Sequence, residues 1–280
     1  MRVRWSSIPH GENHDMVHWM ASRQIWIKDP RYFQHHEFSS TRFFRRLRNL
    51  FRFVVRRVLK SKRPLGPPDW ISTPHATDWS RSPAFSDAYQ RAVDAVGADY
   101  RIPWRIQTLT WAAAQTSQLS GAIVELGTGR GFSMAAVRRF SELRGLQPRD
   151  IYCFDVFEDF SSSGKGMSRH SFAYASRLEE AAYTFRFWDD VHLICGDVYD
   201  TLLENAPESI SLLHVDLNDA QAEAWALQSI WPRISTGGIV VLDDFANLGM
   251  ESTRIRLSNL SHEIGFEILS LPSGQGLVIR

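Results

Sequence analysis

The sequence predicts an α/β fold: a mostly parallel sheet with an antiparallel last strand and helices on both faces, preceded by a basic helical extension. After residue 70, apolar runs typical of strands alternate with amphipathic stretches typical of helices, which is the pattern of a parallel sheet covered by helices. A glycine-rich turn at residues 127–131 joins the first run to a helix. Charge also divides the chain, since residues 1–63 carry a net charge of +11 and residues 64–280 carry −10.

Composition limits the class of protein. The chain has 280 residues, of which 44% are hydrophobic and 12% aromatic, so disordered, collagen-like and disulfide-scaffold proteins are excluded. The two cysteines, Cys153 and Cys195, lie in apolar runs, and we expect both to be buried strand residues of a reduced, cytoplasmic protein. No apolar run approaches the roughly 18–20 residues that cross a bilayer, and the amino terminus lacks the order of a secretory signal.

Residues 1–68 are predicted to form a basic extension that ends in a linker. Between residues 41 and 60, apolar residues recur at helical intervals, and eight arginines or lysines lie between them. No acidic residue occurs from Ser39 to Pro68, so this amphipathic helix would present a wholly cationic polar face. Proline and glycine at residues 64–68 indicate a linker, after which the domain of residues 69–280 begins.

Three roles for the helix at residues 41–60 are open. A basic amphipathic helix suits the surface of an anionic membrane, here the inner face of the cell membrane. Alternatively, its apolar stripe packs on the acidic domain or on a second copy of the chain, which would make a homo-oligomer. Clustered arginines also neutralise phosphates, but no nucleic-acid-reading module is recognisable, so we expect no specific nucleic acid as a partner.

The elements of the domain follow in chain order. Residues 100–119, which include Trp104, Arg105 and Trp111, are predicted to form a helix whose aromatic side chains lie in the core. The first strand and its helix, joined by the glycine turn, are predicted at residues 122–126 and about 133–144. Further strands are predicted at residues 151–155, 191–195, 210–215 and 238–242, helices at 222–230 and 252–262, and a closing hairpin at 265–271 and 276–280 around a turn at 272–275.

Carboxylates stand at the ends of four predicted strands. Asp155 ends the second strand, Asp197 follows the third, Asp216 follows the fourth, and Asp243 and Asp244 follow the fifth. Because such sheets bind ligands at the carboxyl ends of their strands, these acids predict a site at one edge. Converging carboxylates repel one another, and magnesium, which prefers oxygen ligands, would relieve the repulsion. The alternative for Asp243 and Asp244 is a capping or solvent-exposed position.

The glycine turn at residues 127–131 predicts close approach of a ligand. Glycines let a backbone come near a bound group, and the start of the following helix offers free N–H groups to an anionic end such as a carboxylate. A dinucleotide-binding motif would need a third glycine where Phe132 stands, which disfavours NAD.

Residues 125–131, Glu-x-Gly-x-Gly-x-Gly, resemble motif I of the class I S-adenosylmethionine-dependent methyltransferases, whose sheet is Rossmann-like. The resemblance implies that the loop carries the methionine part of the cofactor. It also implies that the acid ending the second strand accepts hydrogen bonds from the ribose, and that the segment after the third strand contacts the adenine. The cofactor-binding residues implied in this way are Glu125, Gly127, Thr128, Gly129, Gly131, Asp155, Gly196, Asp197 and Val198.

A second resemblance concerns residues 214–245, which are similar to the macrocin O-methyltransferase family. The similarity is carried by His-Val-Asp-Leu-Asn-Asp, by Trp-Pro-Arg and by Gly-Gly-Ile-Val-Val-Leu-Asp-Asp-Phe, and it extends over about residues 85–280. It implies methylation of a hydroxyl on a sugar, a glycolipid precursor or a glycosylated natural product. It also implies a magnesium ion bound by Asp216, Asp243 and Asp244, with Asp216 and Asp243 orienting and activating the acceptor.

Two positions depart from that family, and several points stay open. Phe245 stands where tyrosine is frequent and Asn218 where some relatives have aspartate, which leaves the substrate open. The acceptor's proton could go to Asp216, Asp219 or His170, the last of these in a predicted lid at residues 159–171. The same fold also serves hydroxylase components, and a non-catalytic module tethered to a membrane by its basic extension is a further alternative.

Overall fold

A computed structural model of the chain describes residues 68–157 and 178–280. The chain divides into two units, residues 1–66 and 67–280, and the description below concerns the second. The predicted basic helix at residues 41–60, with its membrane contact, lies outside the described residues, as does the whole of the predicted lid with His170. Among the described residues, no helix has both the length and the apolar character needed to cross a membrane.

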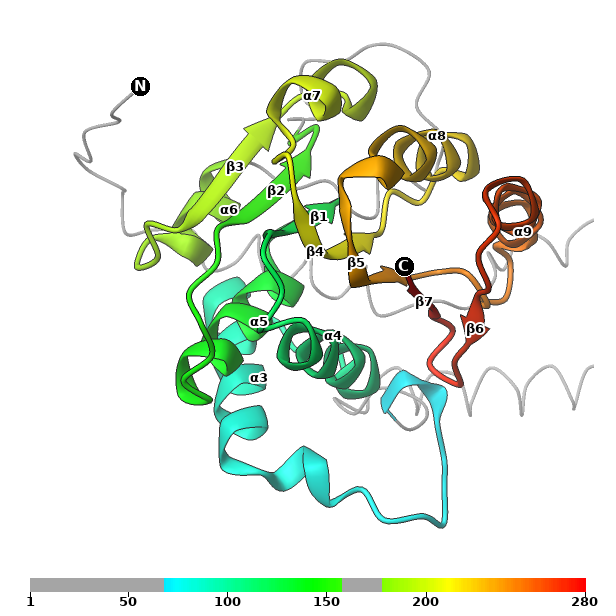
Figure 1. The fold of residues 1–280 in the computed structure, drawn as a ribbon. Coiled ribbons are helices and arrows are strands. Elements are labelled where there is room, and N and C mark those ends of the chain that lie inside the picture. The colour runs from blue at the N-terminus through cyan, green and yellow to red at the C-terminus, as the bar shows by residue number, and fades with distance from the viewer. Residues whose placement is uncertain (1–67, 158–177) are drawn as a thin grey trace, which may run out of the picture. The chain divides into compact units, whose positions relative to one another are not determined.

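A seven-stranded sheet forms the centre of the domain (Figure 1). Its strands are β1 (Ala122–Leu126), β2 (Ile151–Asp155), β3 (Val191–Cys195), β4 (Ile210–Val215), β5 (Ile234–Leu242), β6 (Leu269–Ser270) and β7 (Gly276–Ile279). The strand order is β3-β2-β1-β4-β5-β7-β6, with β1 to β5 mutually parallel and β7 antiparallel to both of its neighbours. The predicted sheet, including its antiparallel last strand, is confirmed.

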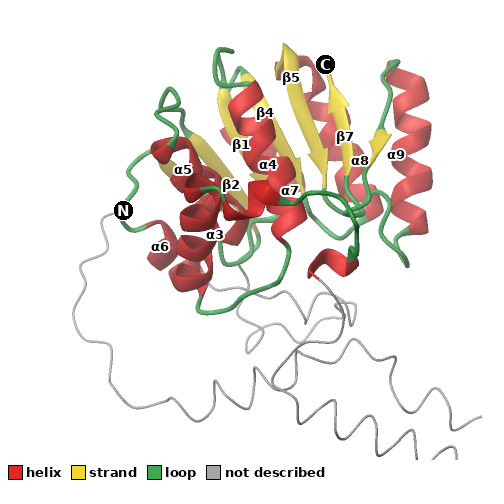
Figure 2. Ribbon diagram, turned by 90° about the horizontal axis from the view of Figure 1, so that it is seen from below, coloured by secondary structure: helices red, strands yellow, loops and turns green. Residues whose placement is uncertain are grey.

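Helices cover both faces of the sheet, because each strand alternates apolar side chains between two cores. Ile123 of β1 lies in one core and Val124 in the other. The first core is closed by α3 (Pro83–Val96), α4 (Pro103–Gln115), α5 (Phe132–Leu143) and α6 (Leu178–Phe185), and the second by α7 (Val198–Asn205), α8 (Ala220–Ile230) and α9 (Glu251–Ile264). Figure 2 shows these elements from a second direction.

Parallel strands bring their carboxyl ends to one edge of the sheet. β1, β2, β4 and β5 therefore end side by side, and the segments that follow them, which carry the predicted site residues, lie along this edge. Two short 3₁₀ turns, η2 (Pro68–Trp70) and η3 (Asp78–Arg81), precede α3, and η5 (Trp231–Arg233) precedes β5. The turn η2 contacts α4 near this edge, since the backbone N–H of Trp104 donates to Asp69 Oδ2 at 2.7 Å.

Some local expectations need correction. Cys153 is buried, but Cys195 is exposed, because it ends β3 at the edge of the sheet, where one side of the strand has no neighbour. Trp111 is 41% exposed and is not a core residue, because the core face of α4 is formed by other residues of the helix such as Ile106 and Leu109. β5 starts at Ile234, four residues earlier than predicted, where Ile234 pairs with Ile210 before a register shift.

Candidate functional site

The glycine loop between β1 and α5 lies directly against the end of β4. Gly127 has a φ of 88°, and a Cβ atom added there would lie 1.9 Å from the carbonyl oxygen of Asp216, so only glycine fits. Gly131, with a φ of 86°, is the N-cap residue of α5 and provides no side-chain cap. The first N–H groups of α5 are therefore open to an anionic ligand, as the loop sequence predicts.

Asp155 fastens the end of β2 to the glycine loop. Its Oδ2 accepts a hydrogen bond from the backbone N–H of Gly129 at 2.7 Å, and its Oδ1 accepts one from Phe157 at 3.0 Å. Burial raises the pKa of this carboxyl above its ordinary value. Each carboxylate oxygen keeps a second lone pair, so Asp155 can still accept hydrogen bonds from the ribose hydroxyls that the resemblance assigns to it.

The segment after β3 lies next to Asp155. Gly196 donates from its backbone N–H to the carbonyl oxygen of Asp155 at 3.0 Å. Asp197 is exposed and is the N-cap of α7, where its side chain accepts from the backbone N–H of Tyr199 at 2.9 Å, while Val198 is buried. A local capping role thus accounts for Asp197, and its contact with adenine stays a prediction.

A row of buried polar side chains runs from β1 to β5 on the α4 face of the sheet. Glu125 pairs with His214 in the register of β1 and β4, and its Oε1 lies 2.9 Å from His214 Nδ1. His214 Nε2 lies 3.4 Å from Asp243 Oδ1. Burial alone would lower the pKa of His214, but hydrogen bonding to Asp243 and Glu125 outweighs it and raises the pKa to about 10. The implied contact of Glu125 with the cofactor stays a prediction, and in the structure Glu125 Oε1 is engaged by His214.

Asp243 and Asp244 are buried, so the solvent-exposed alternative for them is wrong. Asp243 Oδ1 accepts from Gln275 Nε2 at 2.9 Å, and its Oδ2 accepts from Arg105 Nη1. Asp244 Oδ1 accepts from the same Arg105 nitrogen at 3.2 Å and from Asn247 Nδ2 at 3.0 Å. Burial acts to raise the pKa of Asp243, but Arg105 and His214 hold it well below its usual range.

Asp216 completes the cluster. One ligand atom each of His214, Asp216 and Asp243 lies within 4.8 Å of the other two. Burial raises the pKa of Asp216 well above its ordinary value, and the charges of Asp243 and Asp244 raise it further. An unfavourable concentration of carboxylate oxygens is what a hard divalent cation relieves, so the residues present fit such an ion. The geometry differs from the predicted set in one respect, because His214 stands closer to the other two donors than Asp244 does.

Sequence reasoning missed three residues that hold this cluster. Arg105 was expected only as part of a packing helix, although it is the single charged residue in α4 and could have been singled out for that reason. Gln275 was expected only in a turn, yet it is fully buried, and its Oε1 accepts from Ser273 Oγ at 2.9 Å. Asp69 lies 3.9 Å from Arg105 Nε through its Oδ1 and stands where the linker ends, a place with no sequence signal.

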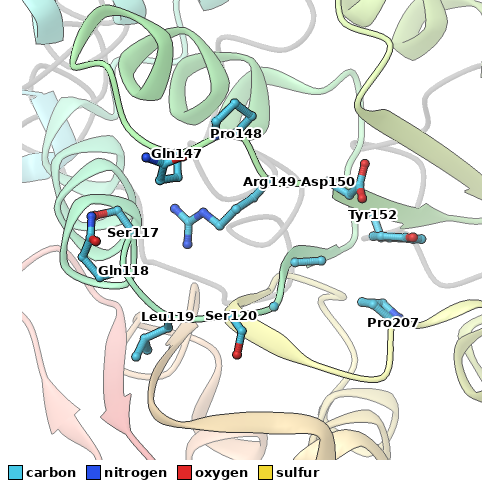
Figure 3. Close-up of a pocket in the computed structure, with 12 residues that line it drawn as sticks. Ser117, Gln118, Leu119, Ser120, Gln147, Pro148, Arg149, Asp150, Tyr152 and Pro207 are labelled. Carbon is cyan, nitrogen blue, oxygen red and sulfur yellow. The ribbon is translucent and has the colours of Figure 1, made fainter.

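A hollow of about 630 Å³ lies at the opposite edge of the sheet, at the amino ends of β1 and β2 (Figure 3). Its Arg149 is bound by the protein itself. The Nη2 atom donates to the carbonyl oxygen of Ala113 at 2.7 Å, and Nη1 donates to Thr116 and Ser211 Oγ. These bonds satisfy carbonyl groups at the carboxyl end of α4. Arg149 is therefore a structural anchor, and the predicted site residues lie at the other edge.

Comparison with known proteins agrees with this geometry. Residues 124–245 match the family described as a methyltransferase domain. Over 139 residues, 45% of this chain and 53% of the relative, the sequence is 27% identical to 8-demethyl-8-(2,3-dimethoxy-alpha-L-rhamnosyl)-tetracenomycin-C 4'-O-methyltransferase of Streptomyces olivaceus. Over 143 residues, 46% of this chain and 54% of the relative, it is 24% identical to demethyldecarbamoylnovobiocin O-methyltransferase of Streptomyces niveus.

The fold is also similar to that of a solved O-methyltransferase. The structure of the O-methyltransferase NovP superposes with a TM-score of 0.57 at 18% identity, covering 68% of this chain and 88% of NovP. The chain spans about half the length of the curated relatives it matches. The matched segment begins in β1, contains the glycine loop and the ends of β2 to β5, and finishes one residue after the paired aspartates. Residues 124–245 of this chain are therefore similar to a methyltransferase domain, and the fold of the described residues is shared with the O-methyltransferase NovP.

Proposed function

We propose that this protein transfers the methyl group of S-adenosylmethionine to a hydroxyl of a glycosylated natural product, with the help of a divalent cation. The observation that carries the proposal is the contact between the glycine loop and the acidic cluster. Gly127 lies against the Asp216 carbonyl so closely that no side chain fits between them. A cofactor held by the loop and an acceptor held by the acids would be neighbours, and positioning of the two reactants is the main requirement of such a displacement.

The proposed cofactor contacts follow the edge from β1 to β3. The open N–H groups of α5 would receive the carboxylate of the methionine part, and Asp155, held by the loop backbone, would receive the ribose hydroxyls. Gly196 and Val198 would border the adenine beside Asp197. S-adenosylmethionine supplies an electrophilic methyl group there, and the protein's part is to hold it toward β4 and β5.

The proposed acceptor site is the acidic cluster. Asp216, Asp243 and Asp244 would hold a magnesium ion, which supplies Lewis-acid activation of the acceptor hydroxyl. Gln275 and His214 fix the orientation of Asp243 through its Oδ1 side. Asp219 is disfavoured as the acceptor of the hydroxyl proton, because its Oδ1 already caps α8 by accepting from Gln221 and Ala222.

The acceptor class rests on the curated relatives. The name of one relative describes a rhamnosyl derivative of tetracenomycin C. The name of the other describes a novobiocin derivative. Both are O-methyltransferases, so an oxygen nucleophile on a large natural product is the common element. We extend this to the present chain as a hydroxyl of a glycoside.

The test combines cofactor binding with methyl transfer. Full-length protein should bind S-adenosylhomocysteine in calorimetry and transfer labelled methyl groups from S-adenosylmethionine to rhamnosylated acceptors in the presence of Mg²⁺. Asp243→Asn should lower kcat by about a hundredfold or more, because it removes the charge that orients the activated acceptor, and should leave S-adenosylhomocysteine affinity within a few-fold. Exposed Asp94→Asn in α3 is the matched control and should match wild type.

Two results would contradict the proposal. A product that gains an oxygen atom rather than a methyl group would indicate a hydroxylase component of the same fold. Absence of S-adenosylhomocysteine binding by folded protein would favour a non-catalytic module. Full activity of Asp243→Asn in the presence of a chelator would remove the metal from the mechanism and leave the methyl transfer in place.

A further inference from the structure

Arg105 stands at the place where a cation is needed. Its Nη1 atom contacts Asp243 Oδ2 and lies 3.2 Å from Asp244 Oδ1, and its side chain is only 16% exposed. Asp243 and Asp244 raise the pKa of this guanidinium, so it is charged at any working pH. Without a metal ion, the protein therefore supplies its own counter-ion to the two acids that follow β5.

The same contacts obstruct a divalent cation. Asp243 has both carboxylate oxygens engaged, Oδ2 by Arg105 and Oδ1 by Gln275 at 2.9 Å. Asp244 Oδ1 is shared by Arg105 and Asn247. An ion that takes these oxygens as ligands must bring its charge close to the guanidinium. Two like charges at one carboxylate repel each other, so Arg105 and the ion compete for Asp243 and Asp244.

Asp69 provides a second position for the displaced guanidinium. Its side chain has no exposed surface, and its Oδ1 lies 3.9 Å from Arg105 Nε, beyond hydrogen-bond distance. Among the described residues, this oxygen has no hydrogen-bond partner, while Oδ2 accepts from the backbone N–H of Trp104 at 2.7 Å. A buried, unpartnered carboxylate oxygen is costly, and a small movement of Arg105 toward it would satisfy it.

We propose that Arg105 is the resident counter-ion of the acidic site and moves from Asp243 and Asp244 toward Asp69 when a divalent cation binds. Arg105 and Asp69 are then positioning residues that together set the affinity of the site for the cation. This inference rests on the metal in the proposed function. It also explains why a charged residue stands alone in the first turn of α4, beside a turn that supplies an acid with no exposed side-chain surface.

The test measures Mn²⁺ binding to the full chain by the electron paramagnetic resonance of the free ion, in the absence of cofactor and acceptor. Arg105→Met should bind Mn²⁺ about tenfold tighter or more than wild type, because the competing charge is gone. Asp69→Asn keeps an oxygen for the Trp104 N–H but offers Arg105 no anion, so it should bind Mn²⁺ about threefold weaker or more. Opposite directions are the diagnostic result, because a merely structural role of the pair would weaken binding in both variants.

Matched controls come from the exposed pair Arg139 and Asp87, whose side chains lie 2.7 Å apart on α5 and α3. Arg139→Met and Asp87→Asn should leave Mn²⁺ affinity unchanged. Arg105→Met leaves buried acids without a counter-ion and could be unstable, so its melting temperature is measured with and without Mn²⁺. The ion should raise that temperature more than it does for wild type. Asp69→Asn gives the independent arm if Arg105→Met does not fold.

The outcomes separate this proposal from the function it rests on. If wild type binds Mn²⁺ and Arg105→Met binds it no tighter, or Asp69→Asn binds it no weaker, the displacement of Arg105 is wrong and the metal-assisted function stands. If neither the wild type nor any variant binds Mn²⁺ while S-adenosylhomocysteine still binds, the proposed metal site is wrong. The proposal for Arg105 is then overturned with it. Loss of S-adenosylhomocysteine binding as well would overturn the methyltransferase function itself.

Discussion

An arginine lies at each end of α4: Arg105 in its first turn and Arg149 beside its last turn. The two arginines have different kinds of partner. At the amino end, Arg105 contacts the carboxylates of Asp243 and Asp244, and carboxylates are groups that divalent cations bind in proteins. At the carboxyl end, Arg149 donates to the carbonyl oxygens of Ala113 and Thr116, which belong to the helix itself. We propose that the first set of contacts is exchanged for a ligand, whereas the second completes the backbone hydrogen bonding of the fold.

The same difference separates the two edges of the sheet. At the carboxyl edge, the pKa values of Asp216 and Glu223 are raised because burial and neighbouring acids disfavour their charged forms. At the amino edge, Arg149 is the buried charge, and burial alone lowers its pKa. Without ligands, the environment of the carboxyl edge thus disfavours the charged forms of its acids. A site of this kind is expected to lower the stability of the unliganded fold and to favour ligand binding. The predictions below test that contrast.

The largest effect is expected at Gly127, where the cofactor loop meets the acidic cluster. Gly127→Ala places a methyl group 1.9 Å from the Asp216 carbonyl oxygen and keeps an unfavourable φ of 88°, so the loop must move. We expect S-adenosylhomocysteine binding to be lost and unfolding free energy to fall by about 3 kcal/mol or more. Calorimetry and urea unfolding measure the two quantities.

Gly129→Ala is the control for that substitution. Its φ is 56°, but a Cβ atom there would meet nothing within 4 Å, so only the backbone strain of about 1 kcal/mol applies. Equal loss of stability in both variants would show that the close contact between loop and cluster is not the cause. The proposed adjacency of cofactor and acceptor would then lose its main support.

The sheet, the glycine turn and the acids at the strand ends could be predicted because each is a local pattern. An apolar run, a turn and a terminal carboxylate can be recognised within about ten residues of sequence. Parallel strands bring their carboxyl ends to one edge regardless of the conformation of the loops between them. Asp216 and Asp243 were predicted at one site for this reason, and the structure brings them together. Strand order is not local, which is why Cys195 was expected to be buried although it ends an edge strand.

The residues that hold the acids could not be predicted in the same way. Arg105 and Asp243 are 138 positions apart, and Gln275 reaches Asp243 across 32 positions. Neither contact corresponds to a residue spacing that can be recognised in a single sequence. Arg105 could have been suspected only because a lone charge in an otherwise uncharged helix must find a partner if it is buried. The identity of that partner depends on how α4 lies over the sheet.

A smaller effect, on stability alone, is expected at the amino edge. Arg149→Met would leave the carbonyl oxygens of Ala113 and Thr116 and the hydroxyl of Ser211 without this donor. We expect the unfolding free energy in urea to fall by about 2 kcal/mol, because buried acceptors lose charged hydrogen bonds. Mn²⁺ affinity and S-adenosylhomocysteine affinity should remain those of wild type. A change in either affinity would mean that the two edges are coupled and that the contrast between them is wrong.

The last effect is expected from Glu223 in α8, and it tests whether the carboxyl edge disfavours the charged form of a buried acid. Burial, with the charges of Asp244 and Asp243, raises its pKa to about 8, from an ordinary value of 4.5. The folded state therefore holds a proton that the unfolded state releases between these values, so this residue makes stability fall as pH rises from about 4.5 to about 8.

Glu223→Gln removes that dependence, because glutamine resembles the protonated acid and its Oε1 can still accept from the backbone N–H of Asn218, as Glu223 does at 3.1 Å. We expect this variant to unfold with nearly the wild-type free energy at pH 5 and to be more stable than wild type at pH 9, by up to about 1.4 kcal/mol for each unit by which folding raises the pKa. Urea unfolding at a series of pH values measures the difference, and exposed Glu208→Gln should follow wild type throughout. A constant difference between Glu223→Gln and wild type across this range would show that folding does not raise the pKa of Glu223, and that the carboxyl edge disfavours charged acids less than we infer.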